Sequence, residues 1–163
     1  MEKLEVRVRE CLAKGWLEVN ILFEILGSPK EHIIEVLNLL IKKIGEEKGV
    51  IVVKNKVHEA HLAKHAETFF SSFAEVEIVV EDLKKLIEIV FDYMPSSVEI
   101  VSPPDLKFEL SGANGLLNDL ATRLHQYDTL VRAIRAERDL FKEKLDKAGI
   151  KIDDEEREKV KSI

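Results

Sequence analysis

The chain has 163 residues, of which 45% are hydrophobic and 34% charged, and its formal net charge is −6. This apolar content excludes a generally disordered chain, and the length suits one domain of ordinary size plus an appendage. The negative charge disfavours a nonspecific nucleic-acid binder, which needs a concentrated positive field to release counterions. Glu, Lys and Ile are frequent, as they are in proteins from thermophiles.

The cysteine content and the hydropathy pattern indicate a cytoplasmic protein. Cys11 is the single cysteine, so the chain cannot form an intramolecular disulfide or a cysteine-based zinc cluster. The first ten residues are charged and lack the apolar run of a secretion signal. A membrane-spanning helix needs roughly 18 consecutive apolar residues, and the sequence contains no such run. We therefore expect a soluble, cytoplasmic protein with no membrane contact.

Residues 16–26 alternate between apolar and polar side chains, which is the pattern of a strand with one buried face. Gly27 ends this strand. Ser28, Pro29 and Glu31 then form the signature of a capping box, in which Ser28 caps a helix and Pro29 occupies its first position. One apolar stripe continues this helix to Gly45 or Gly49.

Three further strands and a second helix are predicted in the next part of the chain. The β-branched residues 50–57 predict the second strand, and the alternating residues 73–80 predict the third. An apolar stripe over residues 83–94 predicts a helix, which Pro95 ends. Residues 97–101 predict a short fourth strand.

The order strand, helix, strand, strand, helix, strand over residues 16–104 is that of the ferredoxin-like α+β fold, in which both helices cover one face of an antiparallel sheet. The first and third strands then lie centrally, with the second beside the third. This places Lys54 and Lys56 near Glu75 and Glu77 on the open face, as a cross-strand charge match. An RNA-recognition domain of this topology presents aromatic rings and positive charge there, so we expect no nucleic-acid binding through this face.

Two segments carry a resemblance to known families. The block EVEIVVEDLKKLIEIVFDYMPSSVEIVSP resembles a family of uncharacterised archaeal proteins. The opening of strand, Gly27, Ser28, Pro29 and helix is similar to that of ACT-type regulatory domains, although the long segment between the second and third strands departs from that pattern. The ACT likeness implies a small-ligand site at a subunit interface near Gly27, Ser28 and Lys30, where helix amides would meet an anion.

A group of three histidines is the candidate metal site. His58, His61 and His65 are spaced by three and four residues, so on a helix all three would point to one side. They could then ligate zinc, with water or Glu67 as a fourth ligand, in a metal-dependent enzyme. The alternative is a polar connector with solvated imidazoles, because ligands from consecutive turns of one helix converge poorly on a tetrahedral ion. We identify no catalytic residue.

Residues 111–147 predict a long helix with a coiled-coil seam, because apolar residues recur at alternating steps of three and four. Gly112 and Gly115 predict the turn at which this helix is entered, and Arg138 is the one polar residue in the seam. With Leu117 at heptad position a, the apolar members of the seam are Leu117, Leu120, Leu124, Tyr127, Val131, Ile134, Phe141 and Leu145.

Charges beside the seam are consistent with pairing between two copies of the helix. In a parallel dimer, Arg123 would face Asp128 of the other chain and Glu137 would face Lys142, both with opposite charge. An antiparallel helical hairpin with another element is a further possibility, because heptads do not fix orientation, and the sequence leaves parallel and antiparallel pairing open. The rival arrangement is intramolecular, with the seam folded onto the open face of the sheet.

The length of the helix favours the intermolecular arrangement. Between residues 117 and 145 it would span roughly 43 Å at ~1.5 Å per residue, which is more than one small sheet requires. The sequence therefore predicts four parts: an N-terminal extension (1–15), a ferredoxin-like domain (16–104), a long helix (111–147) and a charged tail (148–163). We expect a non-enzymatic module that forms a homo-oligomer or binds a protein partner, with an ACT-like ligand sensor and a zinc-dependent enzyme as alternatives.

Overall fold

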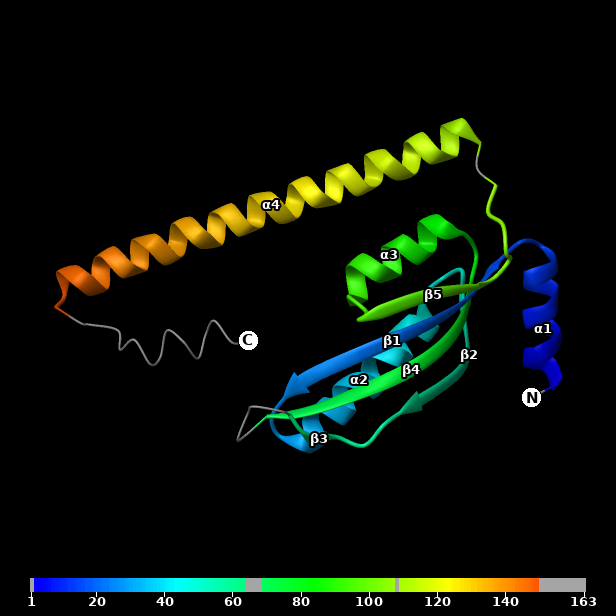
Figure 1. Ribbon diagram of the computed structural model, residues 1–163, viewed down its shortest axis with the longest axis horizontal. Helices are drawn as coiled ribbons and strands as arrows, with labels where there is room; N and C mark the ends of the chain where they lie inside the picture. The colour runs from blue at the N-terminus through cyan, green and yellow to red at the C-terminus, as the bar shows by residue number, and fades with distance from the viewer. Residues whose placement is uncertain (1, 64–68, 108, 150–163) are drawn as a thin grey trace. The chain divides into compact units, whose positions relative to one another are not determined.

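The computed structural model describes residues 2–63, 69–107 and 109–149 (Figure 1). They form two compact units, Met1–Lys107 and Phe108–Ile163. In chain order the elements are α1 (Glu2–Ala13), β1 (Leu17–Gly27), α2 (Lys30–Glu46), β2 (Val50–Val57), β3 (His61–Leu62), β4 (Phe70–Val80), α3 (Leu83–Tyr93), β5 (Ser97–Ser102) and α4 (Leu110–Lys147).

The first unit contains an antiparallel sheet with strand order β2-β4-β1-β5, to which β3 adds a short pairing with β4. The predicted connectivity and strand order of the ferredoxin-like fold are therefore confirmed. The predicted charge register is also confirmed, because Lys54 lies opposite Glu77 and Lys56 opposite Glu75. The β3 strand was not predicted, since two residues are too few for an alternating pattern.

The main core lies between the sheet and helices α2 and α3. Alternate side chains of the central strands point to this face, as the period of two along a strand requires. The apolar stripes of both helices pack against them, so the two crossovers cover the same side of the sheet. The buried core residues include Leu17, Val19, Ile21 and Phe23 of β1, Val76, Ile78 and Val80 of β4, Leu37, Ile41 and Ile44 of α2, and Leu86 and Ile89 of α3.

Helix α1 covers part of the other face, near the end of the sheet where β1 begins. Cys11 of α1 is buried with Ile51 of β2 and Val79 of β4. Val8 and Trp16 are partly buried against this second cluster. The N-terminal residues, whose structure the sequence left open, thus form a helix that narrows the open face.

The predicted capping box at the start of α2 is wrong. Pro29 is extended, with ψ of 169°, and the helix begins one residue later than predicted, at Lys30. Pro29 therefore occupies the N-cap position, where it has no side-chain cap, and its carbonyl accepts hydrogen bonds from the amides of His32 and Ile33. A Ser28 cap would require Pro29 to have helical dihedral angles, which its extended conformation excludes.

Helix α3 has clear signals at both ends. The Asp82 side chain accepts a hydrogen bond from the amide of Lys85 at 2.7 Å, which satisfies one of the unpaired donors of the first turn. At the other end Met94 is left-handed, with φ of 47°, and its amide donates to the carbonyl of Val90. Pro95 follows, so the predicted end of this helix is confirmed.

The second unit contains α4, a single helix of 38 residues. Its start differs from the prediction, because the helix begins at Leu110 and Gly112 and Gly115 lie inside it. A Cβ atom added at either glycine would meet no atom within 4 Å, so neither glycine is required by packing within the described residues. The predicted long C-terminal helix is confirmed.

Candidate functional site

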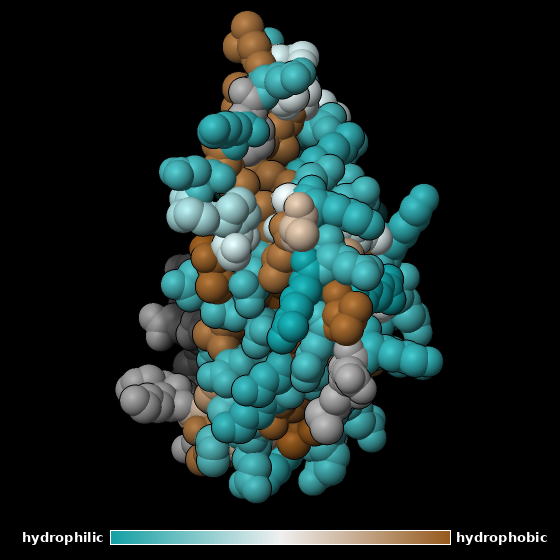
Figure 2. Space-filling view, turned by 90° about the vertical axis from the view of Figure 1, so that its right-hand side faces the viewer, coloured by the Kyte–Doolittle hydropathy of each residue, from teal (hydrophilic) through white to brown (hydrophobic). Residues whose placement is uncertain are grey.

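The most prominent surface feature is a line of apolar side chains along α4. We call it the α4 ridge and define it by Leu117, Leu120, Leu124, Tyr127, Val131, Ile134, Phe141 and Leu145. Six of its eight members are exposed, among them Leu117 (63%) and Leu124 (61%). Figure 2 shows apolar side chains reaching the surface among the hydrophilic ones. An apolar line of this length, interrupted at Arg138, is typical of an interaction surface, because burying each large apolar side chain stabilises a complex by roughly 1.5–3 kcal/mol.

Ion pairs within α4 lie beside the ridge and, at Arg138, in the seam itself. Asp128 accepts a hydrogen bond from Nε of Arg132 at 2.8 Å, one turn further along the helix. Arg138 donates through Nε and Nη2 to Oδ1 of Asp139, at 3.0 and 2.8 Å. These groups are largely exposed, and exposed pairs contribute little to stability. These ion pairs therefore orient their own side chains, but they are weak enough for the same charged groups to pair with residues of another chain instead.

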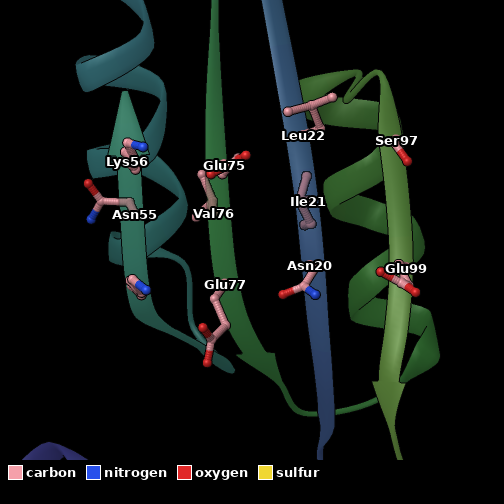
Figure 3. Close-up of a pocket in the computed structure, with 11 residues that line it drawn as sticks. Asn20, Ile21, Leu22, Asn55, Lys56, Glu75, Val76, Glu77, Ser97 and Glu99 are labelled. Atoms are coloured by element: carbon pink, nitrogen blue, oxygen red, sulfur yellow. The ribbon is translucent and has the colours of Figure 1, made fainter. Parts of the chain in front are cut away.

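The open face of the sheet carries a shallow cleft of about 510 Å³. Figure 3 shows its side chains in rows across β2, β4, β1 and β5. One row places Lys54, Glu77, Asn20 and Glu99 side by side, in the order given by the strand register. Within the described part of the chain, the residues that line this cleft include no aromatic side chain. Its charges are mixed: two lysines lie opposite two glutamates across β2 and β4, and Glu99 on β5 adds a third carboxylate opposite Asn20. The cleft therefore has no strong preference for one sign of charge.

The structure places the histidine group differently from the prediction. His61 pairs with Ser71 as part of β3, so the chain is extended at this residue, and the shared side that the three-four spacing would give on a helix does not apply there. The segment is extended because it continues alongside the first residues of β4. His65 lies outside the described residues, and among the described ones no three His, Cys, Asp or Glu side chains are placed to hold a metal ion.

His58 has a local packing role that the sequence did not reveal. Its ring stacks on Phe73, with centroids 4.0 Å apart and an interplanar angle of 19°. Its Nε2 lies 3.4 Å from Oε2 of Glu75, with no hydrogen bond between them. The carbonyl of His58 accepts a hydrogen bond from the hydroxyl of Ser72 at 2.7 Å. This satisfies the one buried polar side chain of the described core, because Ser72 is only 1% exposed.

A second polar cluster joins the end of α2 to α3. Glu47 accepts hydrogen bonds from Oη of Tyr93 and from Nζ of Lys85, both at 2.8 Å. The hydrogen bonds from Lys85 and Tyr93 lower the pKa of Glu47, and the bond to Glu47 raises the pKa of Lys85. Burial, together with the bond to Glu47, raises the pKa of Tyr93 to about 12. These residues lie 38 and 46 positions from Glu47, so no local pattern could have revealed the cluster.

The predicted ligand-binding turn is a site of close packing. A Cβ atom at Gly27 would lie 2.9 Å from Cγ2 of Ile33, so glycine is required where β1 meets α2. Gly27, Ser28 and Lys30 do not line the cleft on the open face. The ACT-type ligand site stays a prediction.

The described helices include none that is long and apolar enough to cross a membrane. Comparisons with curated proteins and with solved structures gave no match. A family model described as the MJ0538 family matches residues 18–161, which include the whole of α4. The name of this family comes from an archaeal reading frame, in agreement with the predicted archaeal resemblance. Because this match extends over most of the chain, the protein belongs to the MJ0538 family.

Proposed function

We propose that this protein is a non-enzymatic module that associates with another polypeptide through the α4 ridge, most simply with a second copy of itself. The observation that carries the proposal is the ridge, an apolar line along a helix that has no buried residue of its own. Its three-four spacing is the seam by which helices pair in coiled coils.

The chemistry of the open sheet face makes it a poor cover for this ridge. The face presents Lys54, Lys56, Glu75 and Glu77 in its central rows. An apolar helix laid over these rows would take charged groups out of water without supplying new hydrogen bonds. Helix α1 already covers the apolar end of this face, around Ile51 and Val79. An apolar ridge of equal length on another chain is the better match.

Substitutions in the ridge test the proposal. Leu124→Asp combined with Ile134→Asp places charges in the seam, and it should dissociate the assembly at micromolar concentration, because two apolar contacts of roughly 1.5–3 kcal/mol each are lost per chain. Sedimentation velocity should show the unaltered chain as an oligomer and this variant as a monomer of 18.6 kDa.

Lys147→Asp is the matched control, since Lys147 is exposed, lies off the ridge and pairs with Glu143, one turn earlier in the same helix. This variant should remain associated. Far-UV circular dichroism should show that the sheet unit is intact in both variants. A double variant that keeps the sedimentation coefficient of the unaltered chain would contradict the proposal, as would an unaltered chain that is already monomeric.

A further inference from the structure

We propose that the occupant of the α4 ridge is a second copy of this chain in the antiparallel orientation, with Leu124 of one protomer opposite Ile134 of the partner subunit. This inference rests on the proposed function and specifies the partner and its direction. It is carried by two residues that a parallel pair accommodates poorly, Arg138 in the seam and Leu130 beside it.

Arg138 disfavours the parallel orientation. In a parallel, in-register pair the a positions face each other, so the two Arg138 guanidinium groups would meet in the seam. These groups stay charged at all accessible pH values, and like charges repel strongly where water is excluded. In the antiparallel pair an a position faces a d position, which places Arg138 opposite Leu120 of the partner subunit. The stem of Arg138 can then cover this leucine while its guanidinium keeps the bonds to Asp139.

The same register fills the rest of the seam with apolar contacts. It places Leu117 opposite Phe141 of the partner subunit, and Tyr127 opposite Val131 of the partner subunit. Each of these layers occurs twice, because the pair has a two-fold axis. The only layer with a charge is the one between Arg138 and Leu120.

The positions beside the seam also fit the antiparallel pair. Arg123 lies opposite Glu137 of the partner subunit, so two contacts of opposite charge form. Leu130, which is 55% exposed in the single chain, meets Leu130 of the partner subunit on the two-fold axis. In the parallel pair Leu130 would instead face an arginine, Arg135. The antiparallel register thus explains an apolar side chain that lies outside the a and d positions.

Two features favour the parallel orientation, and both concern exposed charges. The antiparallel register brings the two Asp128 side chains towards each other, but each already binds Arg132 of its own chain at 2.8 Å. The parallel register offers twice as many contacts of opposite charge, since Glu137 would also meet Lys142. Exposed pairs contribute little, whereas the groups in the seam are desolvated, so the seam decides the orientation.

Single-cysteine variants of the full chain test the orientation. In a Cys11→Ala background we would prepare Leu117→Cys and Phe141→Cys as separate proteins and oxidise them mildly, alone and mixed. Neither variant should form disulfide-linked dimers alone, whereas the mixture should give the linked heterodimer. Gln126→Cys is the control, because Gln126 lies off the seam. It should give no disulfide-linked dimer, either alone or mixed with one of the other two variants.

The outcomes separate this inference from the proposed function. Linked dimers from each variant alone would overturn the antiparallel orientation and leave self-association standing. A monomeric mass for the unaltered chain, with no linked species in any sample, would overturn both proposals.

A charge exchange gives a second measurement that does not depend on disulfide geometry. Arg123→Glu should weaken association about tenfold, because two attractive contacts become repulsive. The double variant Arg123→Glu with Glu137→Arg should restore association to within about threefold of the unaltered chain. In a parallel pair both changes create like-charge contacts, with Asp128 and with Lys142, so a double variant weaker than the single one would overturn the inference.

Discussion

Glu47 is the residue through which helix α2 is tied to helix α3. Its two carboxylate oxygens are shared between Tyr93 and Lys85, and Lys85 also donates to Glu88 at 3.3 Å. The two helices belong to different crossovers, and each otherwise contacts the sheet. This cluster therefore fixes their relative position on the covered face.

Replacing this carboxylate should weaken the sheet unit. Glu47→Gln should lower the free energy of unfolding by about 1 kcal/mol, a value reduced for the partial exposure of Glu47. Chemical denaturation at pH 7 would measure the change. Glu46→Gln is the matched control, because Glu46 is exposed and lies 3.9 Å from Lys42, and it should have almost no effect. Equal losses in the two variants would contradict the role assigned to Glu47.

The same cluster predicts a pH dependence with a definite sign. The pKa of Glu47 is lowered in the folded state. Ionised Glu47 therefore stabilises the fold fully above its unfolded-state pKa of 4.5, and this stabilisation is lost as the pH falls through its folded-state pKa. The pKa of Tyr93 is raised to about 12, so the contribution of its hydrogen bond is present below pH 10 and is lost as the pH rises towards 12. The difference in stability between the unaltered chain and Glu47→Gln should therefore shrink below about pH 4.5. A difference that grows on acidification would contradict this assignment.

Gly27 shows how a correct prediction can have a different physical cause. The sequence indicated that Gly27 ends a strand, but the structure shows that its missing side chain admits Ile33, a residue that is 1% exposed. Gly27→Ala should destabilise the sheet unit by about 1–3 kcal/mol, because the added methyl group overfills a buried contact. Thermal unfolding of the variant and of the unaltered chain would measure this loss of stability.

Gly45→Ala provides the comparison for this test. A Cβ atom at Gly45 would lie 3.5 Å from Cγ2 of Val52, which is an ordinary contact, and Gly45 is inside a helix. This variant should be neutral or slightly stabilising, since alanine favours helix more than glycine does. A Gly27→Ala variant as stable as Gly45→Ala would show that the turn has room for a side chain.

At the scale of the elements, long periodic segments were predictable and short or aperiodic ones were not. The burial of alternate β1 residues and the apolar stripes of α2 and α3 follow directly from their spacing. Helix α1 has a narrower stripe, in which Cys11 is the buried residue, and its packing against Ile51 and Val79 depends on strands far along the chain. The histidine segment is extended because of its pairing with β4, which its own sequence does not encode.

The glycines of α4 offer a test of this element alone. Gly112 and Gly115 lie in helical turns with open space around them, so changing both to alanine should stabilise the start of α4 by about 0.5–1 kcal/mol per site. Far-UV circular dichroism during thermal unfolding would measure the gain in helicity.

Gly149 should respond in the opposite direction. It follows the last turn of α4 with a left-handed φ of 73°, a conformation that alanine adopts with difficulty. Gly149→Ala should therefore lower the stability of the helix end. A gain from this variant equal to that from the Gly112 and Gly115 changes would contradict the assigned helix boundaries.

At the scale of the whole molecule, the sequence predicted which surfaces exist but not how they are used. The charges of the open face and the apolar members of the α4 ridge could both be located from spacing alone. The apolar heptad repeat alone is compatible with either orientation of a helix pair. The residues that interrupt or flank the repeat, Arg138 and Leu130, are the ones that distinguish the two orientations. The heat-adapted character and the cytoplasmic location stay predictions.

If a second polypeptide covers the α4 ridge, the molar mass of the protein in solution must exceed that of one chain. Sedimentation equilibrium should be performed on the full chain and on a chain that ends at residue 107, where the sheet unit with its own core is complete. We expect the full chain to show twice its 18.6 kDa mass and the shortened chain to be monomeric. A full chain that stays at 18.6 kDa at every concentration, or a shortened chain that still associates, would show that the α4 ridge is not the surface of association.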